Sequence, residues 1–283
     1  MNILLTGATG FIGSNILNKI KDNNKVYLIL RNKKKNKIFK DKNIKIINFT
    51  DYKILNYKLS KLKIDIIIHA ATHYSKRHVN DDLQKFTNSN ILLGNIILDN
   101  LKKMKTKKFI NFSTVWEDYN GIEKNYFNLY SAYKKAFSNI IEFYKNNLKY
   151  IKFYNLMISD TFGTNDNRPK LINVLKSNYK KNKTTTIVSK KLIINLLNVE
   201  DVVDAVVSIV KKNIKPGKYL IKNPTNFQFS KIFEMFNKKN KKKLKIKWLN
   251  NSTIKEKSLS YSKLKSWKPR KSNIEDIINT IKY

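Results

Sequence analysis

Short apolar runs alternate with segments of helical periodicity along this chain. Residues 1–5 form a mostly apolar run with the length of a buried strand, and from residue 11 to 20 the apolar positions recur at helical spacing. Further strand-like runs lie at 25–30, 44–47, 64–68, 108–112, 151–157 and 217–221, and helical patterns at 81–103 and 130–144. Strands that alternate with helices predict βαβ units and a parallel sheet.

A glycine-rich turn joins the first strand to the first helix, with the sequence TGATGFIG at residues 6–13. Gly7 permits a tight turn, Gly10 lets a pyrophosphate approach the backbone, and Gly13 lets the helix pack closely on the strand. The helix N-terminus adds unpaired N–H groups that favour phosphates. The predicted dinucleotide contacts here are Gly7, Thr9, Gly10, Phe11, Ile12 and Gly13.

The spacing of this turn is GxxGxxG after a threonine, instead of GxGxxG. This variant resembles the short-chain dehydrogenase/reductase superfamily, and TGATGFIGS resembles its extended branch, the NAD-dependent epimerase/dehydratase family. The resemblance implies an α/β fold, with a Rossmann-type doubly wound parallel sheet of about seven strands and a smaller C-terminal substrate lobe. It implies a dinucleotide-binding domain at residues 1–156, to which 192–212 return, and a substrate lobe mainly at 157–283.

The formal net charge of +38 is the most unusual feature of the composition. Such a charge attracts polyanions, so one hypothesis is a dinucleotide-bound RNA-binding or scaffold protein. However, specific base contacts rely on arginine, and only 4 of the 58 basic residues are arginine. The lysines are also spread over the whole chain. We therefore favour a general lysine bias and expect no specific nucleic-acid partner.

Several kinds of site are not expected from the composition. The chain has no cysteine, and its three histidines form no HExxH motif, so we predict no metal site. No apolar run approaches the roughly 20 residues needed to span a bilayer. Because the first strand begins at Met1, no charged-then-apolar leader precedes it, and we expect a cytoplasmic protein.

The residue after the second strand indicates the cofactor. In the dinucleotide fold an acidic residue here binds the ribose hydroxyls of NAD, whereas an arginine accommodates the 2′-phosphate of NADP. This chain has Arg31 at that position, followed by Lys33–Lys35, and no carboxylate. The pattern predicts that NADP(H) is preferred, with NAD(H) as the other possibility.

The family resemblance implies further cofactor contacts. Asn48 resembles the counterpart of an aspartate that contacts adenine, and Phe49 follows it. Ala70, Ala71 and Thr72 lie at the exit of the strand at 64–68, where small residues let the backbone lie against the cofactor. We interpret His69, just before them, as structural.

A tyrosine and a lysine four residues apart form the predicted catalytic pair. Tyr130 and Lys134 lie on one face of a helix, one turn apart. A phenol has an unperturbed pKa near 10, and a nearby ammonium lowers that pKa towards neutrality. In the family Lys134 also binds the nicotinamide ribose. Thr114, after the strand at 108–112, matches the family's catalytic Ser or Thr, with Ser113 in reserve.

The segment after residue 157 resembles a narrower group, the nucleotide-sugar 4-ketoreductases typified by CDP-abequose and CDP-paratose synthases. The matching residues are the DTxG and NDxRxK patterns, and the resemblance implies that Asp160, Arg168 and Lys170 bind substrate. The predicted reaction is reduction of the C4 keto group of an NDP-4-keto-6-deoxyhexose by NADPH.

The alternative within the same family is an NDP-sugar 4-epimerase or dehydratase that retains NAD. Dehydratases of the family have acidic residues directly after the catalytic Thr, whereas here Val115 and Trp116 precede Glu117. This spacing makes a dehydratase the weaker alternative. By analogy with the family, a homodimer through the Tyr130–Lys134 helix is also possible.

Overall fold

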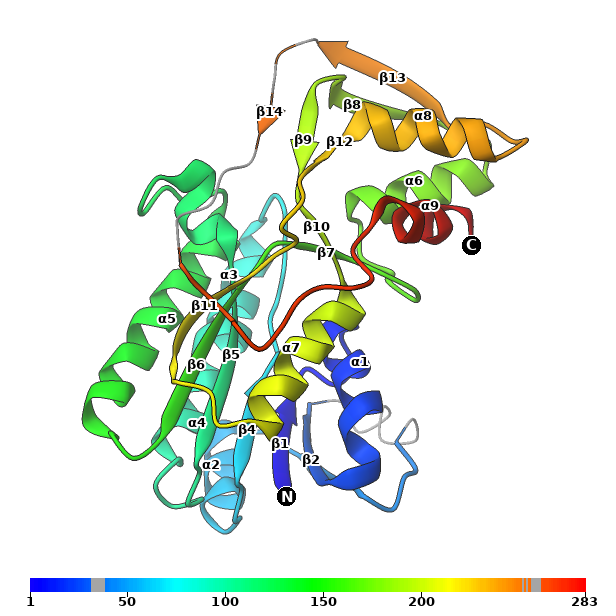
Figure 1. Cartoon of the computed structure of the whole chain (residues 1–283). Helices are drawn as coiled ribbons and strands as arrows, with labels where there is room; N and C mark the ends of the chain where they lie inside the picture. Colours follow the sequence, from blue (N-terminus) through cyan, green and yellow to red (C-terminus); the bar gives the residue numbers. More distant parts are fainter. Residues whose placement is uncertain (32–38, 251, 253, 256–260) are drawn as a thin grey trace.

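The computed structural model describes residues 1–31, 39–250, 252, 254, 255 and 261–283. Lys33–Lys35 therefore lie outside the described residues. The chain folds into a large sheet flanked by helices and a smaller group of helices and strands beyond its carboxyl edge (Figure 1).

The large sheet contains eight parallel strands in the order β15-β11-β6-β5-β4-β1-β2-β3. The order reverses between β1 and β4, as in a doubly wound dinucleotide-binding sheet. The eighth strand exceeds our expectation of about seven, because β15 has only two residues and no apolar pattern. The strands are β1 (Asn2–Thr6), β2 (Lys25–Leu30), β3 (Ile44–Asn48), β4 (Ile66–His69), β5 (Lys108–Thr114), β6 (Lys152–Ile158), β11 (Gly217–Ile221) and β15 (Ser262–Lys263).

Helices cover both faces of this sheet (Figure 1). One apolar core joins a face of the sheet to α1 (Phe11–Ile20) and α7 (Val199–Lys211), which pack against each other. A second core joins the opposite face to α2 (Tyr52–Ser60), α4 (Leu93–Asp99) and α5 (Leu129–Asn147). The continuous apolar strands follow from this arrangement, because both faces of the sheet are buried.

A third apolar core lies in the smaller part of the molecule, at the top of Figure 1. Its helices are α6 (Leu171–Lys180), α8 (Phe229–Lys239) and α9 (Ile274–Lys282). Its strands are β8 (Thr184–Ser189), β9 (Leu192–Ile194), β12 (Phe227–Gln228), β13 (Lys245–Asn250) and β14 (Ile254–Lys255). The short strands β7 (Asp160–Phe162) and β10 (Leu196–Asn198) pair with each other and connect this part to the large sheet.

The single helix expected at residues 81–103 is instead three consecutive pieces. They are α3 (Asn80–Phe86), the π-helical segment η3 (Thr87–Leu92) and α4. Within η3, the Asn90 side chain accepts from the His73 backbone N–H (2.7 Å) and donates to its carbonyl (3.0 Å). Asn90 therefore fixes the loop after β4, and π-helical segments of this kind are frequent at functional sites.

A buried aspartate at the start of α7 fixes the chain's C-terminal segment. The Asp201 carboxylate accepts from the backbone N–H groups of Arg270 (2.7 Å) and Lys271 (3.1 Å), and its backbone carbonyl accepts from Trp267 (2.8 Å). Because Asp201 is 1% exposed, no water molecule can take its place as the hydrogen-bond partner of these donors.

We expect Asp201→Asn to lower the free energy of unfolding by about 2 kcal/mol, because an amide offers a donor where the carboxylate accepts. Urea denaturation measures the change. The matched control is Asp204→Asn, an exposed position on the same helix, where we expect a change within about 0.5 kcal/mol. Equal losses in both variants would contradict the role of Asp201.

Candidate active site

The glycine turn between β1 and α1 has the close contacts that its sequence predicted. Gly7 has φ +73°, and a Cβ there would lie 2.6 Å from the Ala70 carbonyl carbon. A Cβ on Gly13 would lie 2.1 Å from the Gly7 carbonyl oxygen. Gly10 donates its N–H to that oxygen at 2.9 Å. Side chains are thus excluded where the turn meets α1 and the β4 exit, and the backbone is left open to a ligand.

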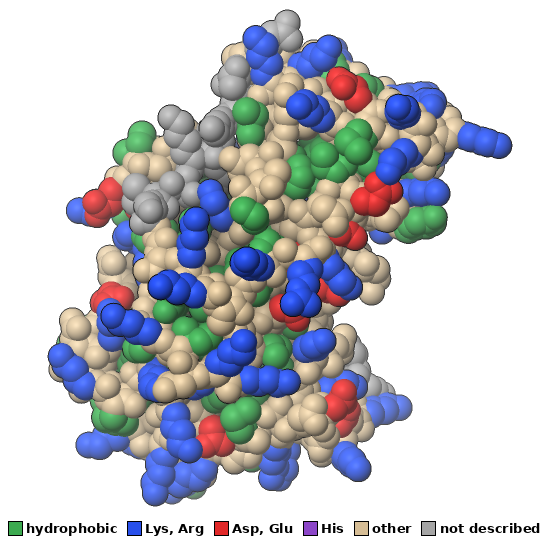
Figure 2. Space-filling view, viewed as in Figure 1, with side chains coloured by type: hydrophobic (Ala, Val, Ile, Leu, Met, Phe, Trp, Pro, Cys, Tyr) green, Lys and Arg blue, Asp and Glu red, His purple; other side chains and the backbone are tan. Residues whose placement is uncertain are grey.

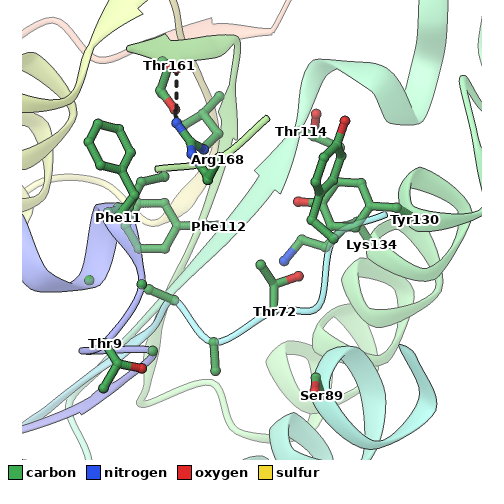
Figure 3. Close-up of a pocket in the computed structure, with 18 of the residues that line it drawn as sticks. Thr9, Phe11, Thr72, Ser89, Phe112, Thr114, Tyr130, Lys134, Thr161 and Arg168 are labelled. Atoms are coloured by element: carbon green, nitrogen blue, oxygen red, sulfur yellow. Dashed lines mark hydrogen bonds between the residues drawn. The ribbon is translucent and has the colours of Figure 1, made fainter. Parts of the chain in front are cut away.

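A cavity of about 540 Å³ extends from this turn across the carboxyl ends of the strands, where open α/β sheets bind ligands. In Figure 3, Thr9 and Phe11 lie on one side of it, and Thr114, Tyr130 and Lys134 on the other. The predicted site residues that line it are Gly7, Thr9, Gly10, Phe11, Ile12, Gly13, Arg31, Phe49, Ala70, Ala71, Thr72, Thr114, Tyr130, Lys134, Asp160, Arg168 and Lys170.

Among the predicted site residues, all of which are described, Asn48 is the one that does not line this cavity. It is the last residue of β3, and its carbonyl accepts from the Lys58 ammonium at 2.7 Å. Phe49, the residue after β3, does line the cavity. The adenine contact of the Asn48 side chain stays a prediction.

Arg31 reaches the cavity and meets a residue that the sequence analysis did not single out. Its Nη2 donates to Ser89 Oγ at 2.8 Å. Ser89 belongs to η3, and both residues line the cavity. The π-helical turn that brings Ser89 here gives no clear signal in the sequence.

Thr114 and Tyr130 present hydroxyl groups to the same cavity. Thr114 Oγ1 accepts from the Trp116 N–H at 3.2 Å, which leaves its own O–H free to donate into the cavity. Ser113, the reserve residue, has its hydroxyl 3.4 Å from Ser138 on α5. Its neighbour Thr114 is therefore the better-placed donor.

The pKa of Tyr130 corrects one expectation. Burial raises the pKa of this phenol above its usual value, and a hydrogen bond with Thr72 opposes the rise without cancelling it. The prediction that Lys134 brings this pKa down towards neutrality is wrong for this structure, because desolvation outweighs the favourable charges. Tyr130 is therefore a neutral phenol near neutral pH, which is the form that carries a proton.

Lys134 is 4% exposed, and burial lowers its pKa to about 8, against the opposing effect of Glu117. Its ammonium is thus still mostly charged at neutral pH. His69, beneath it, bonds to Thr6 Oγ1 at 3.0 Å, and burial lowers the pKa of His69 to about 3. This neutral, buried His69 packs in the core and does not line the cavity.

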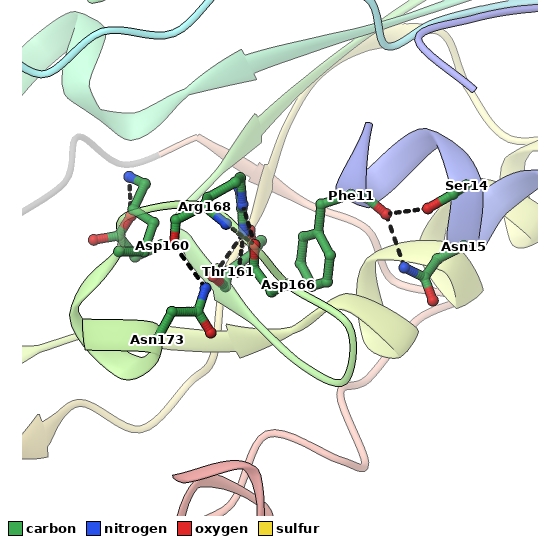
Figure 4. Close-up of polar contacts among 9 residues, drawn as sticks. Phe11, Ser14, Asn15, Asp160, Thr161, Asp166, Arg168 and Asn173 are labelled. Atoms are coloured by element: carbon green, nitrogen blue, oxygen red, sulfur yellow. Dashed lines mark hydrogen bonds and ion pairs between the residues drawn. The ribbon is translucent and has the colours of Figure 1, made fainter. Parts of the chain in front are cut away.

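The loop between β7 and α6 is held together by one arginine (Figure 4). Arg168 pairs with Asp166 through two contacts, Nε–Oδ1 at 2.7 Å and Nη2–Oδ2 at 2.8 Å. It also donates to the carbonyl of Thr161 at 3.0 Å and lies over the Phe11 ring at 4.4 Å. Arg168 therefore joins the predicted substrate loop to the glycine turn, in addition to lining the cavity.

Lys170 lies between a carboxylate and two aromatic rings. Its Nζ is 2.8 Å from Asp160 Oδ1, 4.0 Å from the Trp116 ring centroid and 4.5 Å from that of Tyr74. The Tyr74 ring contacts the Tyr130 ring edge-on, with centroids 5.1 Å apart. A cation is thus fixed one aromatic ring away from the candidate proton donor.

Sequence reasoning missed several lining residues. The predicted site residues did not include Tyr74, Phe112 or Ser159. All three line the cavity, and the buried Ser159 Oγ has no hydrogen-bond partner. For Phe112, the signal was available: it lies two residues before Thr114 on β5, and residues at this spacing share one face of a strand.

The described residues contain neither a candidate metal site nor a membrane-spanning helix. Among the described residues, no group of three or more His, Asp or Glu side chains could hold a metal ion, and no helix has the length and apolarity for crossing a membrane. Figure 2 shows Lys and Arg side chains spread over the visible face instead of gathered in one area. This distribution agrees with a general lysine bias.

Comparison with known proteins identifies the family of this chain. Residues 3–221 match the NAD dependent epimerase/dehydratase family, which is more than half of the sequence and includes the glycine turn, Thr114, Tyr130 and Lys134. The chain belongs to this family. Its fold and its class, an NAD-dependent enzyme of sugar nucleotides, agree with the sequence resemblance.

Characterised members of the family are moderately similar in sequence. CDP-abequose synthase of Salmonella muenchen is 25% identical over 250 residues, covering 87% of this chain and 83% of that protein. CDP-abequose synthase of Yersinia pseudotuberculosis is 28% identical over 216 residues, covering 75% and 74%. A dTDP-D-glucose 4,6-dehydratase of Dictyostelium discoideum is 30% identical over 267 residues, covering 81% of this chain and 59% of that protein.

Solved structures of the family share the fold. UDP-glucuronic acid 4-epimerase of Bacillus cereus, in complex with UDP-glucuronic acid and NAD, has a TM-score of 0.79 at 21% identity, covering 99% of both chains. UDP-N-acetylglucosamine 4-epimerase of Methanobrevibacter ruminantium M1 has a TM-score of 0.79 at 20% identity, covering 99% of this chain and 96% of that one. At these identities the likeness establishes the fold alone.

We expect Arg168→Lys to weaken the binding of cofactor and of sugar nucleotide by about tenfold each, because a lysine cannot keep the paired contacts with Asp166 or the stacking on Phe11. Calorimetric titration measures both affinities. The control is Arg77→Lys on the exposed surface, which should leave both unchanged. A loss of sugar-nucleotide binding alone would show that Arg168 acts only as a ligand and does not join the two loops.

Proposed function

We propose that this protein reduces the C4 keto group of an NDP-4-keto-6-deoxyhexose, with NADPH as the preferred reductant. The main support is that a single cavity contains the glycine turn, the proton-carrying Tyr130 and the cationic loop with Arg168 and Lys170. The similarity to CDP-abequose synthases over most of the chain adds support for this type of substrate.

The residues of the glycine turn fit a dinucleotide. Gly7 and Gly13 leave no room for a Cβ, and the first N–H groups of α1 have no partner within the helix. The unpartnered, buried Ser159 Oγ at the far end of the cavity offers one more polar contact. The nicotinamide, when bound, supplies the hydride. The turn would hold the pyrophosphate, and Phe49, Ala70 and Ala71 the adenosine and ribose side.

Tyr130 is the proposed proton donor. As hydride reaches the carbonyl carbon, the carbonyl oxygen gains negative charge and takes the phenolic proton. Thr114 donates a hydrogen bond to the same oxygen, and the two donors together stabilise the developing charge. The Lys134 ammonium stabilises the phenolate that Tyr130 leaves behind, and it orients the ribose.

The cavity also carries positive charge that complements the substrate's diphosphate. Arg168 and Lys170 both line it, and the net charge of +38 attracts polyphosphates in general. Asp160 keeps Lys170 extended over Trp116, and the aromatic side chains beside Tyr130 provide an apolar surface for a deoxy sugar.

The proposed preference for NADPH depends on Arg31. It lies at the end of β2 and reaches the cavity, with Ser89 as its hydrogen-bond partner. A guanidinium next to a hydroxyl offers donors to a 2′-phosphate. No carboxylate follows β2 among its described neighbours, so nothing there favours the free hydroxyls of NAD. A cytoplasmic location is a further proposal, and so is a homodimer, by family analogy.

An NDP-sugar 4-epimerase with retained NAD is the second candidate, because Tyr130 and Thr114 serve proton transfer in either direction. A dehydratase has less support. It needs an acidic group at the substrate, but Glu117 and Asp118 are 0% and 1% exposed and do not line the cavity.

A panel of NDP-4-keto-6-deoxyhexoses with NADPH and with NADH tests the proposal, with the absorbance of the reduced cofactor as readout. We expect faster consumption of NADPH than of NADH with at least one 4-keto substrate. If no reduced cofactor is consumed, and NAD copurifies with the protein and interconverts 4-epimers, the epimerase is correct instead.

A further inference from the structure

Directly behind the catalytic helix lies a buried carboxylate that the proposed mechanism does not use. Glu117 belongs to the turn η4 (Val115–Gly121) that follows β5, and it is 0% exposed. Its Oε1 accepts from Ser138 Oγ at 3.2 Å, whereas its Oε2 has no hydrogen-bond partner. A buried carboxylate with so few partners costs free energy, and groups of this kind are concentrated at functional sites.

Glu117 is connected to the turn of α5 that carries Lys134. Ser138, its hydrogen-bond partner, is four residues after Lys134 and lies 3.0 Å from the Lys134 carbonyl. Ser138 also accepts from Asn155 of β6 at 3.0 Å. The carboxylate is thus held against the catalytic helix by a buried polar network.

The charged groups around Glu117 come from every element packed against it. They are Lys134, Lys135 and Tyr130 of α5, Lys218 of β11 with Nζ 3.8 Å from Oε2, Asp118 of η4, and Tyr261, which bonds to Asp118. Lys135 pairs with Asp118 at 3.6 Å, and neutral His69 is the further titratable group that interacts with Lys134. Three ammonium groups therefore face two carboxylates, so the loss of Glu117's charge leaves the ammonium groups in clear excess.

We propose that Glu117 is a positioning residue whose negative charge keeps the Lys134 ammonium protonated beside Tyr130. This proposal rests on the catalytic roles proposed above for these two residues. Ionised Glu117 stabilises the charged form of Lys134, and it disfavours a phenolate at Tyr130. The enzyme thereby keeps the cation that stabilises the Tyr130 phenolate once the phenolic proton has moved to the carbonyl oxygen.

The pH range of this effect follows from the two groups. Burial raises the pKa of Glu117 to about 7, with Lys218 as the largest opposing charge, and the pKa of Lys134 is about 8. Below about pH 7 Glu117 takes up a proton and no longer stabilises the Lys134 ammonium. Above that pH its negative charge holds Lys134 protonated. The coupling therefore acts in the neutral range.

NMR of the cofactor-free protein labelled at lysine Cε measures the coupling, with Lys134→Met to assign the resonance. We expect Lys134 to titrate near pH 8, and Glu117→Gln to lower its midpoint by about one pH unit or more. Glu117→Asp keeps the charge and should stay closer to the wild type. The control is Glu234→Gln, an exposed position on α8, which should change nothing.

The two Glu117 variants separate charge from shape. If the side chain were only structural, Glu117→Gln, which keeps the shape, would have the wild-type Lys134 midpoint, and Glu117→Asp would not. That result overturns the proposal. An unchanged Lys134 midpoint in both variants overturns it as well. If Glu117→Gln does not fold, the reciprocal measurement replaces it, because coupling between two sites is symmetric.

In the reciprocal measurement, infrared absorption of the protonated carboxyl group follows Glu117 in Lys134→Met. Its midpoint should rise from about 7 by about one unit, and an unchanged midpoint overturns the proposal. Neither measurement needs a substrate. Failure of the sugar-nucleotide panel would therefore leave the coupling measurable, and absence of coupling would leave the panel unaffected.

Discussion

Tyr130→Phe should lower turnover by about 10²–10⁴-fold, the range typical of the loss of a general acid. The phenol lines the cavity with Thr114, and its raised pKa keeps the proton in place until the carbonyl oxygen becomes basic. Phenylalanine keeps the ring and its edge-on contact with Tyr74, so cofactor affinity should stay within about threefold.

Tyr133→Phe is the matched control for this variant. Tyr133 lies on the same helix, its hydroxyl is 3.3 Å from Thr87 Oγ1, and it does not line the cavity. Turnover should therefore stay within about twofold of the wild type. Steady-state rates with the best 4-keto substrate give both values. If Tyr130→Phe kept most of its turnover, or if Tyr133→Phe lost as much, the assignment of the proton donor would be wrong.

Gly13→Ala should weaken NADPH binding by about tenfold to a hundredfold. The added Cβ would lie 2.1 Å from the Gly7 carbonyl oxygen, so α1 must move away from the turn. The N–H groups of its first turn, which the pyrophosphate needs, move with it. The misfit should also lower the free energy of unfolding by about 1–3 kcal/mol.

The control for this substitution is Asn18→Ala on the same helix. Position 18 is exposed, so the substitution removes side-chain atoms only from the surface. It should leave NADPH affinity unchanged. Fluorescence titration of NADPH measures both variants, and thermal unfolding reports their stability. Unchanged affinity in Gly13→Ala would mean that the cofactor does not depend on the glycine turn.

The features that the sequence predicted correctly depend on local geometry. The glycine turn needs only a strand, three glycines and a helix in succession, and Tyr130 and Lys134 need only helical spacing. The alternation of strand-like runs with helical patterns likewise predicted the parallel sheet. The family resemblance then implied how these elements are arranged, as a doubly wound sheet with a smaller C-terminal substrate lobe.

The features that the sequence did not predict depend on contacts between distant segments. Asp201 bonds to residues about 70 positions away, and Arg31 meets Ser89 of the π-helical segment η3, 58 positions away. The pKa of Tyr130 depends on burial by the folded chain, so the spacing to Lys134 alone gave the wrong direction.

Asn48 and Glu117 show the same limit for single side chains. The family pattern indicated both Asn48 and Phe49, but only Phe49 lines the cavity. Glu117 was considered only as an acidic residue at the wrong distance from Thr114. Its burial against α5 became visible only when β6, β11 and η4 were placed around it.

Transfer of deuterium from the nicotinamide to the sugar tests the central claim most directly. The enzyme is incubated with NADPH deuterated at the transferred C4 position and with an NDP-4-keto-6-deoxyhexose, and the product is examined by mass spectrometry and NMR. The account predicts a product with one deuterium at the sugar C4 and an equal amount of NADP⁺. A 4-epimer without deuterium, formed while the added NADPH stays unchanged, would contradict it.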